Sequence, residues 1–188
     1  MGESVLAVGS TSDEIDRTEA LAQPAEIARR LSERVAGLRG RFTDNALPTR
    51  AARSLVPFFK YTDRCTAPGD RLLVGGFLVE APFYARRLFA GGQEYFDGIF
   101  DSPANQRAAV EHLRRQDVPF MLLPSDVAGE FDRQFPLVAA YVHERYAPLT
   151  DVVVDGDQRI HILVSRDMPA AAQDSETGWP CFRPQPHS

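Results

Sequence analysis

The sequence predicts an α/β protein, a three-layer α/β/α Rossmann-like sandwich with a small mixed sheet and a C-terminal β-hairpin. Residues 71–75 and 118–123 are continuous apolar runs bounded by turn signals, which is typical of strands buried on both faces. Helical patterns separate these runs, and strands joined through helices pair in parallel by right-handed crossovers. Asp155-Gly156 lies between the last two strand-like runs and predicts the hairpin that adds antiparallel strands.

The first third of the chain is expected to be a polar lead-in followed by two helices. Residues 1–23 are polar and acidic and form the lead-in. From Pro24, apolar residues recur at spacings of three and four up to Phe42, which predicts an amphipathic helix. Thr49 can cap a second helix to about Asp63, and Pro57 is expected to kink it. These helices make an N-terminal pair over 24–63.

The sheet core is expected over 71–167, which with the helical pair gives one domain over 24–167. Its remaining predicted elements, besides the two buried runs, are helices over about 81–89, 103–116 and 127–146, the last interrupted near Pro136, and strands over 150–154 and 159–165. Ser102-Pro103 is an N-cap followed by proline at the first helical position. Residues 168–188 are rich in Pro, Ala, Ser and Asp and are expected to form a tail.

Composition excludes some function classes. The 188 residues suit one domain, and hydrophobic and charged contents of 44% and 25% are those of a globular protein. A net charge of −5 without a basic run argues against nucleic acid as a partner. The longest apolar runs are far shorter than the ~20 residues that span a bilayer, and no secretory signal is recognisable. Taken alone, these features indicate a cytoplasmic protein.

Two segments after the first strand are candidates for ligand chemistry. Gly75-Gly76 lies where phosphate-binding loops occur, but no dinucleotide or P-loop pattern is present, so we interpret the glycines as a chain turn. The stretch from Glu80 to Gly92 offers a carboxylate, a phenol, two guanidinium groups and a flexible glycine pair. We predict ligand contacts for Glu80, Tyr84, Arg87 and Gln93 at the carboxyl edge of the sheet, against the alternative of an ordinary amphipathic helix.

No catalytic constellation, metal site or cofactor is predicted. The four histidines share no metal spacing, and His161 in the last strand is interpreted as a hydrogen-bonded structural residue. Asp151, Asp155 and Asp157 lack the ligand series of a calcium loop. Cys65 and Cys181 are either two free thiols or one long-range disulfide, depending on the redox compartment.

Three segments resemble a known family. Residues 61–71, YTDRCTAPGDR, resemble the "Y-x-R-x-C-T-x-P-x-D-R" segment after the last transmembrane helix of certain bacterial multi-spanning glycosyltransferases, with Asp63 standing between Tyr61 and Arg64 and the overall spacing kept. These enzymes are distant relatives of the dolichyl-phosphate-mannose-dependent mannosyltransferases and lipid A aminoarabinose transferases. Residues 87–92, RLFAGG, resemble "R-x-F-A-G-G", and residues 177–183, TGWPCFR, resemble a closing "G-x-P-C-F-R".

The resemblance implies an accessory domain of a larger membrane enzyme. The chain would be the C-terminal domain on the extracytoplasmic, periplasmic side of the inner membrane, and the transmembrane part of the same parent chain would be its partner. Such enzymes use a polyprenyl-phosphate-linked sugar and keep their catalytic carboxylate between membrane helices, so no catalytic residue is expected here. The domain would shape donor or acceptor binding, and Arg87 would hold the anionic group because it belongs to a resembling segment.

The resemblance also implies a disulfide between Cys65 and Cys181, because an oxidising compartment favours pairing and both cysteines lie in resembling segments. Two alternatives stay open. The chain can instead be a self-standing cytoplasmic α/β protein that binds a small anionic ligand, with reduced cysteines. It can also be an interaction module without a ligand.

Overall fold

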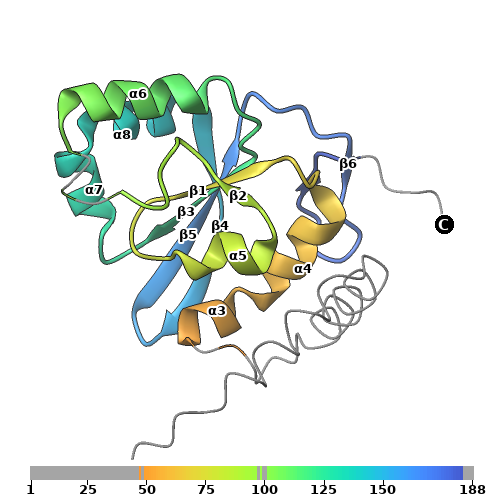
Figure 1. Ribbon diagram of the computed structural model, residues 1–188. Coiled ribbons are helices and arrows are strands. Elements are labelled where there is room, and N and C mark those ends of the chain that lie inside the picture. The colour runs from red at the N-terminus through yellow and green to blue at the C-terminus, as the bar shows by residue number, and fades with distance from the viewer. Residues whose placement is uncertain (1–46, 48, 97, 99–100, 184–188) are drawn as a thin grey trace, which may run out of the picture. The chain divides into compact units, whose positions relative to one another are not determined.

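The computed structural model describes residues 47, 49–96, 98 and 101–183 (Figure 1). The chain divides into two compact units, Met1–Ala46 and Leu47–Ser188, and only the second contains described residues. The predicted lead-in over 1–23 and the helix from Pro24 therefore lie outside the described residues.

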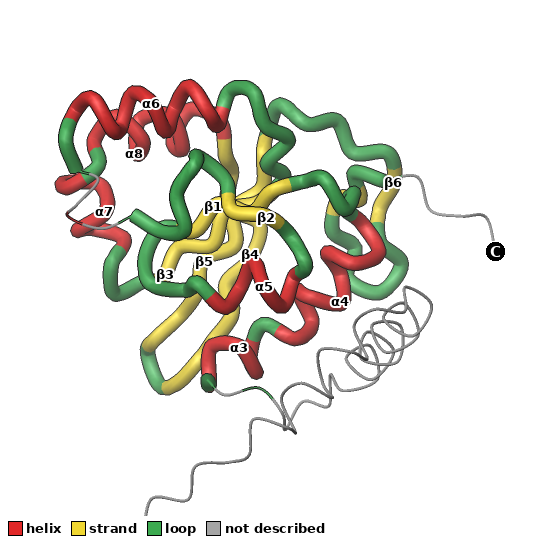
Figure 2. Tube along the Cα trace, in the orientation of Figure 1, coloured by secondary structure: helices red, strands yellow, loops and turns green. Residues whose placement is uncertain are grey.

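The described part of the second unit alternates helices with strands (Figure 2). Its helices are α3 (Arg50–Ser54), α4 (Val56–Cys65), α5 (Glu80–Ala85), α6 (Pro103–Leu113), α7 (Ala128–Gln134) and α8 (Pro136–Arg145). Its strands are β1 (Arg71–Val74), β2 (Leu88–Phe89), β3 (Phe120–Pro124), β4 (Tyr146–Asp155), β5 (Gln158–Ser165), β6 (Ala172–Gln173) and β7 (Pro180–Cys181).

Five of these strands form one mixed sheet in the order β2-β1-β3-β5-β4. Strand β1 pairs in parallel with both β2 and β3, whereas β5 runs antiparallel to β3 and to β4. The α/β class and the mixed sheet are thus confirmed. The hairpin at Asp155-Gly156 is confirmed as well, because β4 ends at Asp155, β5 begins at Gln158, and Gly156 has a φ of 49°.

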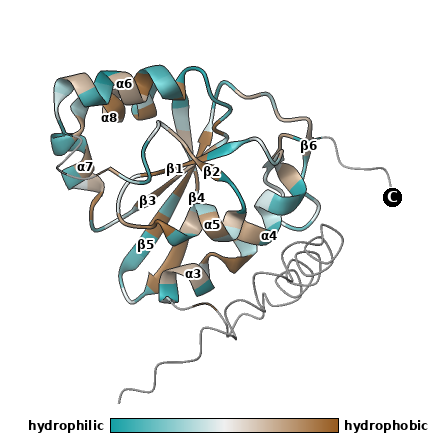
Figure 3. Cartoon of the chain, in the orientation of Figure 1, coloured by the Kyte–Doolittle hydropathy of each residue, from teal (hydrophilic) through white to brown (hydrophobic). Residues whose placement is uncertain are grey.

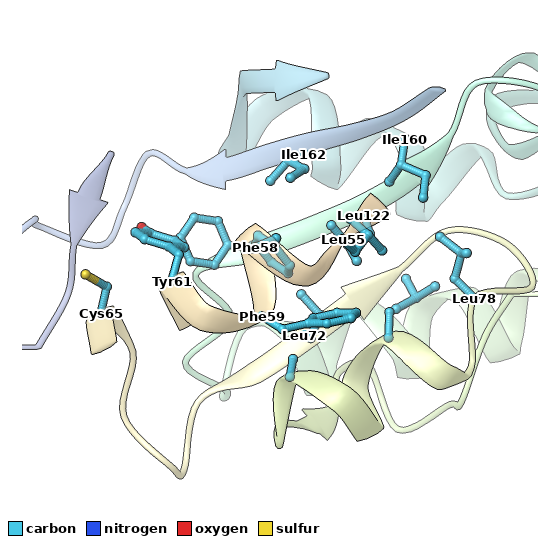
Figure 4. Close-up of a cluster of buried hydrophobic side chains, with 14 of the residues drawn as sticks. Leu55, Phe58, Phe59, Tyr61, Cys65, Leu72, Leu78, Leu122, Ile160 and Ile162 are labelled. Atoms are coloured by element: carbon cyan, nitrogen blue, oxygen red, sulfur yellow. The ribbon is translucent and has the colours of Figure 1, made fainter. Parts of the chain in front are cut away.

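Apolar side chains pack on both faces of the sheet, as alternation along buried strands requires. Figure 3 colours the central strands of the sheet mostly as hydrophobic residues. On one face, α3, α4 and α5 cover Leu72, Phe120, Ile162 and their neighbours (Figure 4). On the other face, α6, α7 and α8 cover Leu73 and Met121. Buried Gln106 of α6 joins the helices of the second face, because its amide donates to the Gln134 carbonyl at 3.3 Å and accepts from Leu137 N at 2.9 Å.

The predicted helix over 81–89 is wrong in its second half. Helix α5 ends at Ala85, and Arg86 adopts the left-handed conformation with a φ of 54°, which closes a helix. Leu88 and Phe89 then form β2 along the edge of β1. A two-residue strand carries no periodic signal of its own, so the sequence pattern could not separate it from the preceding helix.

Two helix boundaries also differ from the expected ones. The second N-terminal helix is divided at Leu55 into α3 and α4. Thr49 caps the start of α3, and α4 begins after Leu55 with Pro57 in its first turn. The break agrees with the predicted effect of Pro57. The last helix ends at Arg145, and β4 starts four residues earlier than predicted, at Tyr146.

The segment expected to be a tail contains a second hairpin, formed by β6 and β7 and distinct from the one at Asp155-Gly156. We call it the C-terminal hairpin, and it is attached to the end of α4. A disulfide joins Cys65 to Cys181, with Cα atoms 4.4 Å apart and both residues fully buried. The Tyr61 hydroxyl donates to the Pro180 carbonyl, and the Phe182 N–H donates to the Cys65 carbonyl at 2.8 Å. The hairpin therefore belongs to the packed domain up to residue 183.

Asp174, on the loop of this hairpin, is a buried carboxylate with several donors. The Arg64 guanidinium donates to both of its oxygens, at 3.1 and 2.9 Å. The Thr177 backbone N–H and hydroxyl donate at 3.1 and 2.8 Å. The hydrogen bonds from Arg64 lower the pKa of Asp174 to about 2, because they stabilise the charged form.

Candidate functional site

The order of the parallel strands defines where a ligand site is expected. Strand β1 lies between β2 and β3; α5 connects β1 to β2 across one face of the sheet, and α6 connects β2 to β3 across the other. Helix α5, which follows β1, and helix α7, which follows β3, lie on opposite faces of the sheet, so the loops after β1 and β3 diverge at their carboxyl ends. In open α/β sheets, ligands bind in the crevice at such a switch point.

A cleft lies at this position, and we call its larger half the aromatic lobe. It has a volume of about 290 Å³. Its lining comes from the segments that follow all three parallel strands: Gly76 and Phe77 after β1, Tyr95 and Phe96 after β2, and Glu130 and Gln134 of α7 after β3. The sheet topology therefore brings together residues that are far apart in the sequence.

A smaller polar lobe of about 200 Å³ lies on the other side of Phe77. Phe77 and Val127 line both lobes. The polar lobe is also lined by Asp126 of the loop after β3 and by Gln158 and Arg159 at the start of β5. The aromatic lobe carries a carboxylate, and the polar lobe carries one guanidinium and one carboxylate.

The glycine pair at the base of the cleft is explained by packing. A Cβ atom on Gly75 would come within 2.7 Å of the Leu123 and Met121 side chains. Gly76 has a φ of 135° and approaches Val127, where a Cβ would lie 2.9 Å away. These contacts explain both glycines without a bound phosphate, in agreement with their interpretation as a chain turn.

The turn after Gly76 places two neighbouring apolar residues in opposite environments. Leu78 is buried in the core, whereas Phe77 is 72% exposed. The Phe77 ring packs edge to face against Tyr95, with centroids 5.2 Å apart and planes at 86°. Phe77 is therefore held beside the cleft with most of its ring open to solvent.

Glu80 and Tyr84 lie on α5, and neither lines the cleft lobes described above. The Glu80 carboxylate accepts a hydrogen bond of 2.9 Å from the Thr49 hydroxyl, which joins α5 to the start of α3. The half-buried Tyr84 ring packs against Phe59, with centroids 5.8 Å apart. Both residues contact neighbouring helices.

Arg87 lies at the opposite, amino edge of the sheet, because it precedes Leu88, which pairs with the first residue of β1. Its guanidinium donates to the Thr66 hydroxyl at 2.8 Å, the Thr62 carbonyl at 2.7 Å and the Thr66 carbonyl at 3.1 Å. Burial lowers the pKa of Arg87, but an arginine remains protonated. Its donors are thus engaged within the protein.

Gln93, the fourth predicted contact, lies after β2 and outside both lobes. Its Oε1 atom is buried and accepts no hydrogen bond from the described residues. The structure therefore does not gather Glu80, Tyr84, Arg87 and Gln93 into one cleft. Ligand contact by any of them stays a prediction.

The three resembling segments meet at the amino edge of β1. The C-terminal hairpin is bound by Tyr61, Arg64 and Cys65. Arg87 donates hydrogen bonds to the Thr62 carbonyl of α4 and to the carbonyl and hydroxyl of Thr66, which follows α4. Within the described residues, the contacts of these segments are internal to the protein. Their side chains build the fold at the edge opposite the cleft.

Two further polar pairs involve β4. Asp151 and His161 face each other across β4 and β5, with Oδ1 and Nδ1 2.7 Å apart, so His161 is hydrogen-bonded as predicted. Asp155 forms an ion pair with Arg50. Across the described part of the chain, no group of three metal-ligating side chains comes together.

The cleft residues Phe77, Tyr95, Glu130 and Gln134 were not predicted as a site. Because the sequence pattern predicts no strand at β2, the loop that carries Tyr95 could not be assigned to the carboxyl end of a strand. The usable signal was Gly75-Gly76-Phe77 at the end of a buried strand, followed by Glu130 and Gln134 four residues apart on one helix.

Comparison with known proteins adds no assignment: no family model, no curated protein and no solved structure matches the chain. Among the described residues, no helix is long and apolar enough to cross a membrane.

Proposed function

We propose that this domain is a non-catalytic accessory domain of a bacterial membrane glycosyltransferase that uses a polyprenyl-phosphate-linked sugar. It lies on the extracytoplasmic side, beside the transmembrane part of the same parent chain, and it binds part of the donor or acceptor. We also assign the fold to the Rossmann-like three-layer sandwiches, in which a switch-point cleft is a binding site.

The observation that carries this proposal is the cleft at the carboxyl ends of β1 and β3. Among the described residues, aromatic rings and an amide line its larger lobe, together with the carboxylate of Glu130. Such a mixture of aromatic and polar side chains suits the binding of a small polar ligand.

The buried disulfide supports the extracytoplasmic location. Cys65 and Cys181 are joined and fully buried, and disulfides persist in oxidising compartments and are rare in the bacterial cytoplasm. A thiol-trapping experiment tests the location: cells that express the parent gene are alkylated before lysis, and the cysteines of the domain are then counted. Protected cysteines are expected, whereas two alkylated thiols would contradict the extracytoplasmic assignment.

An activity assay tests the non-catalytic role. The 188-residue protein is incubated with a short-chain polyprenyl-phosphate sugar and a soluble acceptor. We expect no glycosyl transfer and no hydrolysis. Turnover by the purified protein that disappears in a Glu130→Gln variant would refute the proposal, because it would make the cleft an active site.

A second candidate is a self-standing cytoplasmic protein that binds a small anionic ligand. One observation favours it: Arg159 lines the polar lobe, and its guanidinium forms no ion pair with another described residue. The same thiol-trapping experiment separates the two candidates, since a cytoplasmic protein keeps its cysteines reduced.

A further inference from the structure

The aromatic lobe has the chemistry of a sugar-binding subsite. We propose that it binds a neutral or amine-bearing sugar ring, stacked on Phe77, with its hydroxyl groups on Glu130 and Gln134. This inference rests on the proposed function, whose ligand class it specifies. It follows from the exposure of Phe77, the placement of two polar side chains, the charge of the lining and the size of the lobe.

Phe77 supplies the stacking surface. An aromatic ring that is 72% exposed beside a cleft gains little for folding, because it removes little apolar surface from water. Its edge-to-face contact with Tyr95 fixes its orientation. The face of an aromatic ring carries negative charge density and attracts polarised C–H groups and ammonium groups. A sugar ring presents such C–H groups on its faces.

Glu130 and Gln134 supply the polar contacts. They lie four residues apart on α7, so both project from one side of the helix, and both line the lobe. Neither side chain forms a hydrogen bond or ion pair with another described residue. The carboxylate accepts hydrogen bonds and the amide both donates and accepts, which matches neighbouring hydroxyl groups that do the same.

The charge of the lobe decides which sugars fit. None of the described residues that line the aromatic lobe is basic, and Glu130 contributes a negative charge. A phosphate or carboxylate placed there would face repulsion without a compensating cation. Neutral sugars avoid this repulsion, and an amino sugar gains attraction from both Glu130 and the ring faces.

The size of the lobe decides how much of a ligand fits. A volume of about 290 Å³ is at the lower end of the roughly 300–1,000 Å³ of small-molecule sites. This space suits one ring better than an extended lipid chain. The lipid part of a lipid-linked sugar would therefore remain outside the lobe.

Binding by the 188-residue protein tests the proposal, with methyl glucoside, glucosamine and glucuronate as probes and amide chemical shifts as the readout. Methyl glucoside and glucosamine are expected to shift resonances of Phe77, Glu130 and Gln134 at millimolar concentrations. Glucuronate is expected to bind several-fold more weakly. A glucoside with a short prenyl group should bind like methyl glucoside if the ring alone is recognised.

Two variants give the proposal its sharpest test. Phe77→Ala is expected to weaken methyl glucoside binding about tenfold, the size of a good aromatic contact. Phe83→Ala is the matched control, because Phe83 is 73% exposed on α5 and lies outside both lobes, and it should leave binding unchanged. Glu130→Gln should remove most of the discrimination against glucuronate.

Several outcomes would overturn the inference. They are an absence of shifts in the lobe with every probe, equal effects of Phe77→Ala and Phe83→Ala, or tighter binding of glucuronate than of methyl glucoside. Sugar binding at another surface would refute the lobe and leave the accessory-domain proposal standing. Catalytic turnover would refute the accessory role and leave the lobe as a sugar site.

Discussion

Replacing Asp174 by asparagine removes the charge of the buried carboxylate that holds the C-terminal hairpin against α4. The change keeps the size and shape of the side chain, so it leaves no cavity. It weakens the paired hydrogen bonds from Arg64 and leaves that guanidinium beside a neutral amide, whose NH₂ group cannot accept. Asp174→Asn therefore tests how much this ion pair stabilises the fold.

The pKa of Asp174 sets the expected magnitude. Its value in the folded protein is lowered from 3.8 to about 2. That difference corresponds to roughly 2 kcal/mol of stability, because one pKa unit is worth about 1.4 kcal/mol. The carboxylate is fully buried in the hairpin, so solvent screens the interaction little. We expect Asp174→Asn to lower the free energy of unfolding by about 2–3 kcal/mol at pH 7.

The sign of the pH dependence follows from the lowered pKa. A carboxyl group that is more acidic in the folded state stabilises the fold above its unfolded pKa of about 4, and this contribution is lost as the pH falls towards 2. The difference in stability between the wild type and Asp174→Asn should therefore be constant from pH 7 to about 5. It should shrink steadily between about pH 4 and pH 2.

Urea unfolding followed by Trp179 fluorescence measures both quantities, because this tryptophan lies in the loop that joins β6 to β7 and packs against Tyr61, with ring centroids 5.1 Å apart. Asp167→Asn is the matched control: its partner Arg145 is also an arginine, but that pair is exposed and should contribute much less to stability. A loss below 0.5 kcal/mol for Asp174→Asn, or a difference that does not change with pH, would refute the reasoning.

Three further substitutions test the fold at the two edges of the sheet. Cys65→Ser should lower the free energy of unfolding by up to about 4–5 kcal/mol, since the disulfide closes a loop over a separation of 116 residues. Chemical denaturation with and without reductant measures this loss, and an unchanged denaturation midpoint would contradict it. Arg87→Ala should cost about 1–3 kcal/mol, because the Thr66 carbonyl loses its donor while the Thr62 carbonyl keeps those of Thr66, and it should not change sugar binding. A binding loss with unchanged stability would restore Arg87 as a ligand contact. Gly76→Ala should lower the melting temperature by an amount equivalent to about 1–3 kcal/mol, because alanine is strained at a φ of 135°, and a neutral result would show that the loop adjusts.

The long, periodic elements were predictable from the sequence. The runs over 71–75 and 118–123 are buried strands, Ser102-Pro103 starts a helix, and Asp155-Gly156 turns a hairpin. In each case local chemistry and burial point to the same structure, so the pattern is sufficient. Strand β2 was missed because two residues show no period and gain their hydrogen bonds only from β1.

The predicted ligand residues show the corresponding limit for the site. Arg87 has the chemistry of an anion-binding residue, but whether its donors face a ligand or the protein depends on which carbonyls the fold places around it. The fold places the end of α4 there. Conversely, the local sequence around Phe77 and Glu130 does not show that both line one cleft, because they become neighbours only when β1 and β3 pair.

The sequence by itself determined the α/β class, the parallel pairing of the buried strands and the elements that the apolar periodicity marks. Tertiary structure alone decided that the resembling segments converge at the amino edge and that the cleft opens at the carboxyl edge. The physical reason is that hydrophobic periodicity is a local property of the chain, whereas a hydrogen-bond partner or a cleft wall comes from residues that only the packing brings close.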